Sequence, residues 1–301
     1  MNSTEYSSQL ISSAESVIQM ALNEDLADHC DITSAATVPQ ATEATVNIVA
    51  RETGRLSGIV LLPLVYRKLC ERDSVPTDTV SIDLKMADGD SLTAGDVVAS
   101  VTGPVRLLLT GERTILNFLI HLSGIASLTH QFVHAIEGSK TVILDTRKTL
   151  PGYRLLHKYA VRCGGGTNHR MGLYDGMLIK DNHLAARGNR SVSDAVTDAR
   201  QWLAQNNMAV PVELEVDTLE QLRTCLTAQP EIVLLDNMTN EQMREAIKIR
   251  NEHAPNTLLE ASGGVNLKTV AGIAATGVDR ISIGALTHSA KALDLGFDWP
   301  W

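Results

Sequence analysis

The chain has 301 residues, a formal net charge of −9 at pH 7 and a sequence pI near 5.5. Its hydrophobic content of 44% is enough to bury one large core and a smaller one, so we expect one or two domains. An acidic chain without a basic, aromatic stripe is not expected to bind nucleic acid, because phosphate backbones require many distributed cations. No Lys or Arg precedes Arg51, and no apolar run reaches the roughly 20 residues of a membrane helix. We therefore expect a cytoplasmic protein with no membrane partner.

The first third of the chain predicts a small α/β domain, which we assign to residues 1–115. Apolar residues recur at helical spacing over residues 6–23, and short alternating runs separated by Gly and Asp follow. A long amphipathic helix is expected from Arg113 to about Ile136, with Gly124 as a candidate break. The expected short elements are strands at 45–50, 80–84 and 97–101 and a helix at 61–70.

Beyond Gly138 the chain alternates apolar runs with helical patterns, which favours a parallel sheet of βαβ units. The runs end in charged residues or glycine, as expected of an α/β barrel whose active site lies at the C-terminal ends of its strands. We assign the barrel to residues 116–289, with a tail at 290–301 that can pack back onto the first domain. The six expected strands are at 142–144, 177–179, 212–216, 232–235, 258–259 and 281–283, and the expected helices are at 194–205, 219–226 and 240–250.

A block of cations and loop glycines lies between Asp145 and His183. It holds seven Lys or Arg against three Asp, a local net charge of +4 in a chain of −9. A block that reverses the sign of its chain predicts a focused field for a small anion, whereas a solvated surface usually mixes charges. The cations and the histidine that we expect in the site are Arg147, Lys148, His169, Arg170 and Lys180.

Two glycine-bearing strand ends are candidates for a phosphate site. Free backbone N–H groups in such loops can bind phosphate, and barrels often place this site after their late strands. The alternative is a pair of tight turns. The residues concerned are Ser262, Gly263 and Gly264 after one strand and Gly284 and Ala285 after the next.

Acidic residues at other strand ends are candidates for a metal site. Glu213 and Glu215 are two residues apart and project to the same side of a strand, and Asp236 ends the following one. Buried carboxylates require a cation or hydroxyl groups, and hard oxygen ligands suit Mg²⁺ that also binds substrate phosphates. Either Glu213 or Glu215 could be the ligand on this reasoning.

Arg113 is unusual because it follows Thr110, a candidate N-cap. The helix macrodipole disfavours a cation at that end, so we expect an anion nearby.

The segments Asp145–Gly152, Gly164–Arg170 and Lys180–His183 together resemble the signature of the quinolinate phosphoribosyltransferases, and weaker similarity extends from about Glu24 to Leu295. The chain departs from that pattern within residues 28–34, where Asp28-His-Cys30 stands before Asp31-Ile-Thr-Ser34 in place of a glycine-rich acidic turn. The resemblance implies an incomplete barrel and a homodimer in which Arg113 enters the neighbouring subunit's site.

The resemblance also implies the roles of the site residues. Arg147, His169 and Arg170 would bind quinolinate carboxylates, and the late glycine loops would bind the 5-phosphate of phosphoribosyl pyrophosphate. Glu215 is favoured over Glu213 as a Mg²⁺ ligand with Asp236. The residues implied in catalysis are Lys148, Lys180, Glu215 and Asp236.

The implied reaction transfers the phosphoribosyl group to quinolinate and releases CO₂, which yields nicotinate mononucleotide and pyrophosphate in de novo NAD biosynthesis. The pyridine nitrogen carries no proton, so no general base and no organic cofactor are required. One alternative is a nicotinate-specific relative of the same fold, and another is a barrel aldolase with Lys180 as a Schiff base. A third is a biotinyl carrier module around Lys85, which lacks matching half-motifs on its two sides.

Overall fold

The structure is a computed structural model that describes residues 3–188 and 190–301. It divides into two compact units. The first comprises Met1–His130, Thr149–Gly165 and Ser289–Trp301, and the second comprises Gln131–Lys148 and Gly166–His288. Each unit therefore contains segments that are far apart in the sequence.

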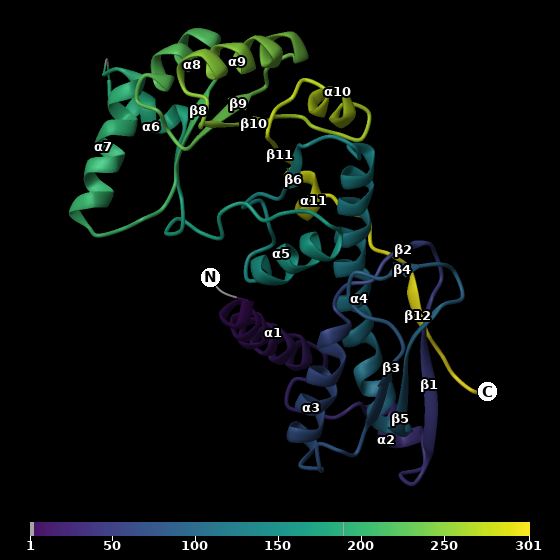
Figure 1. Ribbon diagram of the computed structural model, residues 1–301. Helices are drawn as coiled ribbons and strands as arrows, with labels where there is room; N and C mark the ends of the chain where they lie inside the picture. The colour runs from purple at the N-terminus through teal and green to yellow at the C-terminus, as the bar shows by residue number, and fades with distance from the viewer. Residues whose placement is uncertain (1–2, 189) are drawn as a thin grey trace. The chain divides into compact units, whose positions relative to one another are not determined.

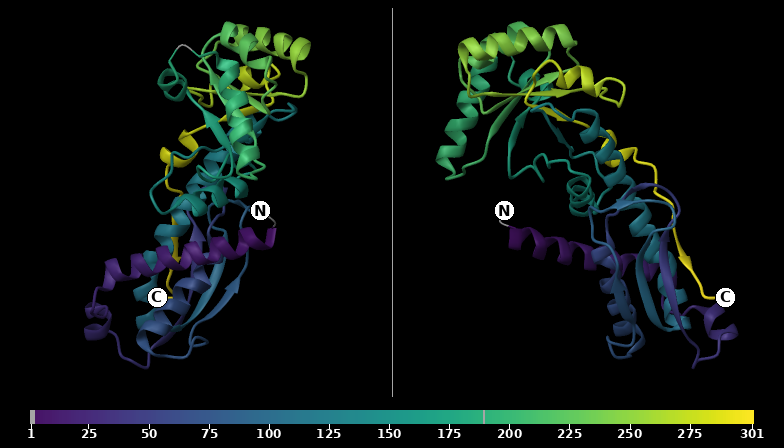
Figure 2. Two further views of the ribbon diagram at one scale, coloured as in Figure 1. Left: turned by 90° about the vertical axis from the view of Figure 1, so that its left-hand side faces the viewer. Right: turned by 45° about the vertical axis from the view of Figure 1, so that its right-hand side comes forward.

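The first unit contains an antiparallel sheet with the strand order β12-β1-β5-β3. Strand β12 comes from the end of the chain and pairs with β1, for example Phe297 with Ile48, as Figure 2 shows in yellow beside purple. The C-terminal residues thus complete the sheet that the N-terminal residues begin. The elements of this unit are α1 (Ser3–Leu26), α2 (Ile32–Thr37), β1 (Glu43–Ala50), β2 (Gly54–Arg55), η1 (Ile59–Leu61), α3 (Leu62–Asp73), β3 (Ser81–Leu84), β4 (Ser91–Leu92), β5 (Val97–Pro104), most of α4 (Val105–Ala135), α5 (Arg154–Cys163) and β12 (Leu295–Asp298).

Helix α4 corrects two expectations. It begins at Val105 rather than Arg113, and Thr110 lies inside it, where its hydroxyl donates to the carbonyl of Arg106 at 2.8 Å. Thr110 is therefore not an N-cap, so the macrodipole argument for Arg113 was wrong. Gly124 does not break the helix either. A Cβ there would lie 2.2 Å from the carbonyl oxygen of Lys291, so the glycine makes room for the C-terminal segment.

The second unit is built around a parallel sheet of six strands, as predicted. Helices α7, α8 and α9 lie along the strands in Figure 1. The strands are β6 (Val142–Leu144), β7 (Met177–Ile179), β8 (Val212–Val216), β9 (Ile232–Asp236), β10 (Leu258–Ser262) and β11 (Arg280–Ser282), and the helices between them are α6 (Asp181–Ala186), α7 (Val192–Gln205), α8 (Leu219–Leu226), α9 (Asn240–His253), α10 (Val270–Ala274) and α11 (Ala285–His288).

The strand order β6-β11-β10-β9-β8-β7 is that of a barrel opened between its first two strands. This confirms the predicted incomplete barrel. On the edge of β6 opposite β11, the backbone N–H of Thr167 donates to the carbonyl of Ile143 at 2.8 Å, and the N–H of Asp145 donates to the carbonyl of Thr167 at 3.2 Å. This short pairing on the open edge fixes the backbone immediately before His169 and Arg170.

The strands of the second unit alternate between two environments. Residues such as Leu214, Leu235 and Ile281 are fully buried and apolar. Their neighbours on the other side of each strand include buried charged groups, among them Glu213 and Glu260. The polar side is the one that forms the site. In the part of the chain that the structure describes, no helix is long and apolar enough to cross a lipid bilayer.

Candidate active site

A cavity of about 840 Å³ lies at the C-terminal ends of the parallel strands in the second unit. Its wall contains the five predicted basic residues of the 147–180 block, both predicted metal ligands and all the predicted phosphate-loop residues. The lining residues are Thr146, Arg147, Lys148, His169, Arg170, Leu178, Lys180, Glu215, Leu234, Asp236, Asn237, Glu260, Ser262, Gly263, Gly264, Val265, Ser282, Ile283, Gly284, Ala285 and His288.

Two neighbouring arginines form the most strongly cationic part of the wall. Partial burial and the nearby charge of Arg147 lower the pKa of Arg170. The Arg170 guanidinium donates to the carbonyl of Gly176 at 2.9 Å, while the buried Nε of Arg147 has no hydrogen-bond partner among the described residues. Two guanidinium groups this close repel each other, so the arrangement favours an anion that carries more than one negative charge.

Lys180 follows β7 and forms an ion pair with Glu215 on the neighbouring strand β8. The Nζ–Oε2 distance is 2.5 Å, and the Glu215 side chain is only 9% exposed. His183 supports this lysine through the backbone, because its Nδ1 accepts the N–H of Lys180 at 2.9 Å. The Lys180 ammonium and the Glu215 carboxylate therefore lie side by side in the cavity wall.

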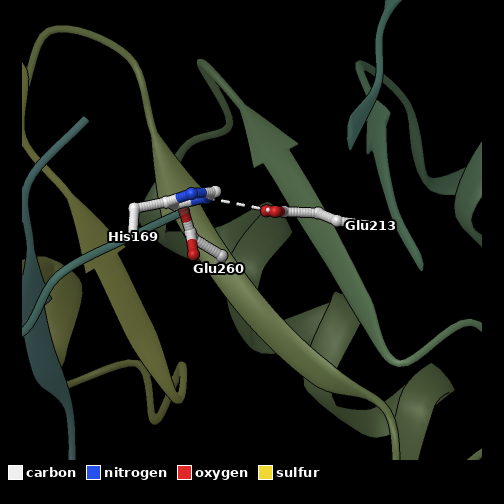
Figure 3. A group of neighbouring side chains, drawn as sticks. All are labelled: His169, Glu213 and Glu260. Carbon is white, nitrogen blue, oxygen red and sulfur yellow. Dashed lines mark ion pairs between the residues drawn. The ribbon is translucent and has the colours of Figure 1, made fainter. Parts of the chain in front are cut away.

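His169 lies on a buried cluster of charges in the barrel interior. Its Nε2 is 3.1 Å from Glu213 Oε2 and 3.4 Å from Glu260 Oε1 (Figure 3). Glu260 in turn pairs with Arg280, whose Nε is 3.1 Å from Oε2. We call these four residues, His169, Glu213, Glu260 and Arg280, the buried ionic cluster. Its members come from β8, β10, β11 and the segment that follows Thr167, so it connects both sides of the open barrel.

The buried ionic cluster holds one extra proton. Burial alone would lower the pKa of His169, but the hydrogen bonds and charges of Glu213 and Glu260 outweigh burial and raise it to about 9. Burial also raises the pKa of Glu213. With one proton shared between the histidine and the glutamates, the cluster is electrically neutral, which is the arrangement that a buried site favours.

The buried ionic cluster also has the donor set of a metal site, since one ligand atom from each of His169, Glu213 and Glu260 lies within 4.8 Å of the others. The backbone of Arg170 argues against that interpretation. Its N–H donates to His169 Nδ1 at 2.7 Å, so Nδ1 carries no proton, and both the ring proton and the extra proton of the cluster lie on the side of Nε2 and the carboxylates. A metal would need the Nε2 lone pair, and the geometry instead favours an internal ion pair that anchors Arg170.

Asp145 holds the segment that contains His169 in place through hydrogen bonds. Its fully buried carboxylate accepts the backbone N–H of His169 at 2.9 Å and the side-chain amide of Asn168 at 2.7 Å. The sequence analysis assigned no role to Asp145, and it did not identify Glu260, Arg280, Asn237 or His288 either. Glu260 and Asn237 come near the ends of apolar runs, and that position could have indicated a place in the site. No feature of the sequence around Arg280 or His288 indicated one.

Glu215 and Asp236 lie at the ends of neighbouring strands, and both line the cavity. Glu213 instead faces His169 in the buried ionic cluster. Two carboxylates beside a polar cavity are a donor set that suits Mg²⁺, which shares its coordination shell with substrate oxygens. The residues present therefore fit a magnesium site formed by Glu215 and Asp236 together with a ligand.

The two glycine loops differ in how their glycines are constrained. Gly264 has φ +58°, and a Cβ there would have no heavy atom within 4 Å, so its left-handed backbone leaves open space in the cavity wall. Gly263 has φ +97°, and a Cβ would lie 2.1 Å from Oδ1 of Asn237. At Gly284 a Cβ would lie 2.9 Å from Cδ of Lys148. Only at Gly264 is the space that a side chain would fill still free for a ligand.

Arg113 belongs to the first unit, on the exposed surface of α4, and is not among the residues that line the cavity. No hydrogen bond or ion pair involves its side chain within residues 3–188 and 190–301. Among the cysteines, Cys70 and Cys225 are buried, Cys163 is partly buried and Cys30 is exposed.

Comparisons with known proteins show the family of this chain. The family described as quinolinate phosphoribosyl transferase, C-terminal domain, matches residues 125–298, and its N-terminal domain matches residues 31–123. Together the two matches cover most of the chain. It therefore belongs to the quinolinate phosphoribosyltransferase family.

Individual relatives span nearly the whole length. The carboxylating nicotinate-nucleotide pyrophosphorylase of Mycobacterium leprae is 46% identical over 95% of this chain and 96% of its own. A probable enzyme of the same name from Bacillus subtilis is 43% identical over 83% of this chain and 82% of its own. The solved nicotinate-nucleotide pyrophosphorylase of Francisella tularensis is 36% identical over 96% of both chains, with a TM-score of 0.84.

Proposed function

We propose that this protein transfers the phosphoribosyl group of phosphoribosyl pyrophosphate to quinolinate and releases CO₂, forming nicotinate mononucleotide and pyrophosphate for NAD biosynthesis. The observation that carries the proposal is the adjacency of Arg147 and Arg170 in a cavity that is also lined by two lysines, Lys148 and Lys180, and by three carboxylates. A dicarboxylate and a diphosphate ester are the anions that such a wall suits.

The chemistry requires no general base. The lone pair of the pyridine nitrogen forms the new bond to the anomeric carbon, and pyrophosphate leaves with the electron pair of the bond that breaks. Lys148 and Lys180 stabilise the charge on the leaving group, and Arg147 and Arg170 hold the ring carboxylates in line. When the 2-carboxylate leaves as CO₂, the quaternary ring nitrogen stabilises the electron pair left on C2, which then takes up a proton.

Mg²⁺ is the proposed cofactor, held by Glu215 and Asp236 and by substrate oxygens. When bound, the ion neutralises negative charge on the diphosphate. The position of Glu215 and Asp236 on neighbouring strands in the cavity wall supports this assignment, and Lys180 holds the Glu215 carboxylate in place there.

We also propose a homodimer in which Arg113 acts in the neighbouring subunit's site. Its exposed side chain on α4, outside the cavity of its own chain, supports this arrangement. Arg113→Ala and Arg170→Ala homodimers should each be nearly inactive. In a mixed dimer one site collects both defects and the other has none, so random subunit exchange should restore about a quarter of wild-type activity. Exchange that mass spectrometry confirms, without recovery, would contradict the sharing of sites.

The alternatives fit the geometry less well. A Schiff-base aldolase requires a neutral lysine amine, whereas Lys180 is paired with a carboxylate at 2.5 Å. A nicotinate-specific enzyme has one carboxylate to bind and no use for two adjacent arginines. The cytoplasmic location expected from the sequence stays a prediction.

One assay tests the proposal. The protein is incubated with phosphoribosyl pyrophosphate, Mg²⁺ and quinolinate labelled in the 2-carboxylate, and both CO₂ and the mononucleotide are measured. Nicotinate replaces quinolinate in the control. We expect labelled CO₂ and mononucleotide in equal amounts with quinolinate and little mononucleotide with nicotinate. Formation of the mononucleotide from nicotinate at a similar rate would favour the nicotinate-specific alternative. The absence of product from both substrates would refute the proposal.

A further inference from the structure

Asn237 connects two parts of the cavity wall that the sequence analysis treated separately. It follows Asp236 at the end of β9 and precedes Thr239, the N-cap of α9. Its backbone N–H donates to the carbonyl of Ser262 at 3.0 Å, so the ends of β9 and β10 are joined at this residue. Asp236 and Ser262 are themselves register partners in the two strands.

The side chain of Asn237 also makes two close contacts. Its Nδ2 donates to Oδ2 of Asp236 at 2.7 Å. Its Oδ1 and Cγ would lie 2.1 and 2.6 Å from a Cβ on Gly263, so only a glycine there accommodates the amide. The amide thus touches the carboxylate assigned to the metal and the loop assigned to the phosphate.

From these contacts we propose that Asn237 is a positioning residue for the phosphoribosyl donor. Its amide orients the Asp236 carboxylate and at the same time fixes Gly263, and through it the loop Ser262–Gly264. The inference rests on the proposed function, because it assigns the two contacted groups to Mg²⁺ and the 5-phosphate. It also changes the reason for Gly263. That residue is a glycine because its φ is +97° and because Asn237 occupies the space of a side chain, whereas Gly264 is the glycine whose open side faces the cavity.

A simpler interpretation is that Asn237 serves only the backbone. Its φ is +52°, a left-handed conformation in which Asn is one of the few favourable residues. This interpretation predicts that glycine would replace it without consequence. The chain offers a matched control, because Asn207 has φ +53°, is exposed and follows α7 outside the cavity.

The experiment compares Asn237→Gly with Asn207→Gly. Both keep the left-handed backbone accessible, and only the first removes the contacts with Asp236 and Gly263. Calorimetry measures the dissociation constants of phosphoribosyl pyrophosphate with Mg²⁺ and of quinolinate, and steady-state assays measure the Mg²⁺ dependence. For Asn237→Gly we expect about tenfold weaker donor binding and a higher Mg²⁺ requirement, because a hydrogen bond to a carboxylate is lost. Quinolinate binding should stay within about twofold of wild type, as should every parameter of Asn207→Gly.

Two further variants make the test independent of any folding defect. Asn237→Asp keeps the left-handed preference and the side-chain shape but replaces the donor with a carboxylate that repels Asp236, so donor binding should fall at least as far. Gly263→Ala should reproduce the donor defect by displacing the amide. Combining it with Asn237→Gly should weaken donor binding by less than the product of the two single effects, because both act through one contact.

The outcomes separate the inference from the function. Donor binding and Mg²⁺ dependence of Asn237→Gly equal to those of Asn207→Gly would overturn the positioning role, and so would an Asn237→Asp variant that binds the donor normally. A wild-type protein that neither binds phosphoribosyl pyrophosphate nor releases CO₂ would instead refute the proposed function.

Discussion

Two parts of the cavity wall are built in opposite ways. The part around Arg170 is supported by the buried ionic cluster, in which Glu260 is fully buried and Glu213 is nearly fully buried. The loop Ser262–Gly264 is held mainly by backbone geometry, and its two glycines are exposed. In the first part a defect leaves a charge unpaired inside the barrel, whereas in the second it changes only the space offered to a ligand. Stability and ligand binding should therefore respond to different substitutions.

The largest effect is expected from Glu260→Ala, which leaves Arg280 and His169 without their shared carboxylate. Breaking a buried ion pair by removing one partner costs about 3–5 kcal/mol of unfolding free energy. The matched control is Glu245→Ala, which removes exposed ion pairs with Lys248 and Arg223 and should cost roughly 0–1 kcal/mol. Urea unfolding of both variants measures the difference, and equal losses would mean that the buried ionic cluster does not hold the barrel together.

The free energy of unfolding should also fall at alkaline pH, because the buried ionic cluster then loses its extra proton. The glutamates raise the pKa of His169 from 6.5 to about 9 in the folded state, and because Nδ1 accepts an N–H, the extra proton is held jointly by Nε2 and the glutamates. The stabilising contribution of this shared proton is complete below pH 6.5. That contribution decreases as the pH rises and is gone once the pH passes 9, which amounts to a few kcal/mol at most. Thermal melts from pH 6 to 10 measure this decline. Glu213→Gln should flatten it, and a variant with the wild-type slope would exclude the cluster as its source.

Arg170→Ala tests the same side of the cavity through ligand binding. Removing charge-assisted hydrogen bonds worth about 1.5–3 kcal/mol should weaken quinolinate binding by about one to two decades. The ionic cluster remains paired, so unfolding should change far less than in Glu260→Ala. Calorimetric titration gives the affinity, and an unchanged value would refute the assignment of Arg170 to quinolinate.

The smallest effect on the fold is expected at Gly264. Its φ of +58° strains any branched residue, and a valine side chain would enter the open space of the wall. Gly264→Val should raise the KM for phosphoribosyl pyrophosphate several-fold while quinolinate binding in its absence stays nearly intact. If both ligands lost affinity equally, the loop would be a structural turn and not a phosphate site.

The sequence by itself determined the periodic features of this protein. Most strands of the barrel follow from short continuous apolar runs, as expected of strands buried on both faces, and β8 follows from an alternation of valine, leucine and glutamate. The cluster of cations follows from a local charge reversal. Both signals are carried by neighbours in the sequence, so they survive without knowledge of the fold.

Only the tertiary structure decided which long-range partners each residue has. Glu213 and Glu215 are equivalent by spacing, yet one pairs with His169 and the other with Lys180. Gly124 was interpreted as a helix break, but it makes room for the backbone of Lys291. Gly263 lies in the cavity wall as predicted, and the sequence did not show that its missing side chain also makes room for Asn237. The start of α4 was misplaced because Thr110 resembles a cap and instead donates within the helix. The physical reason is common to all of these cases, since steric space and ion pairing depend on atoms that the fold brings together and that local patterns do not record.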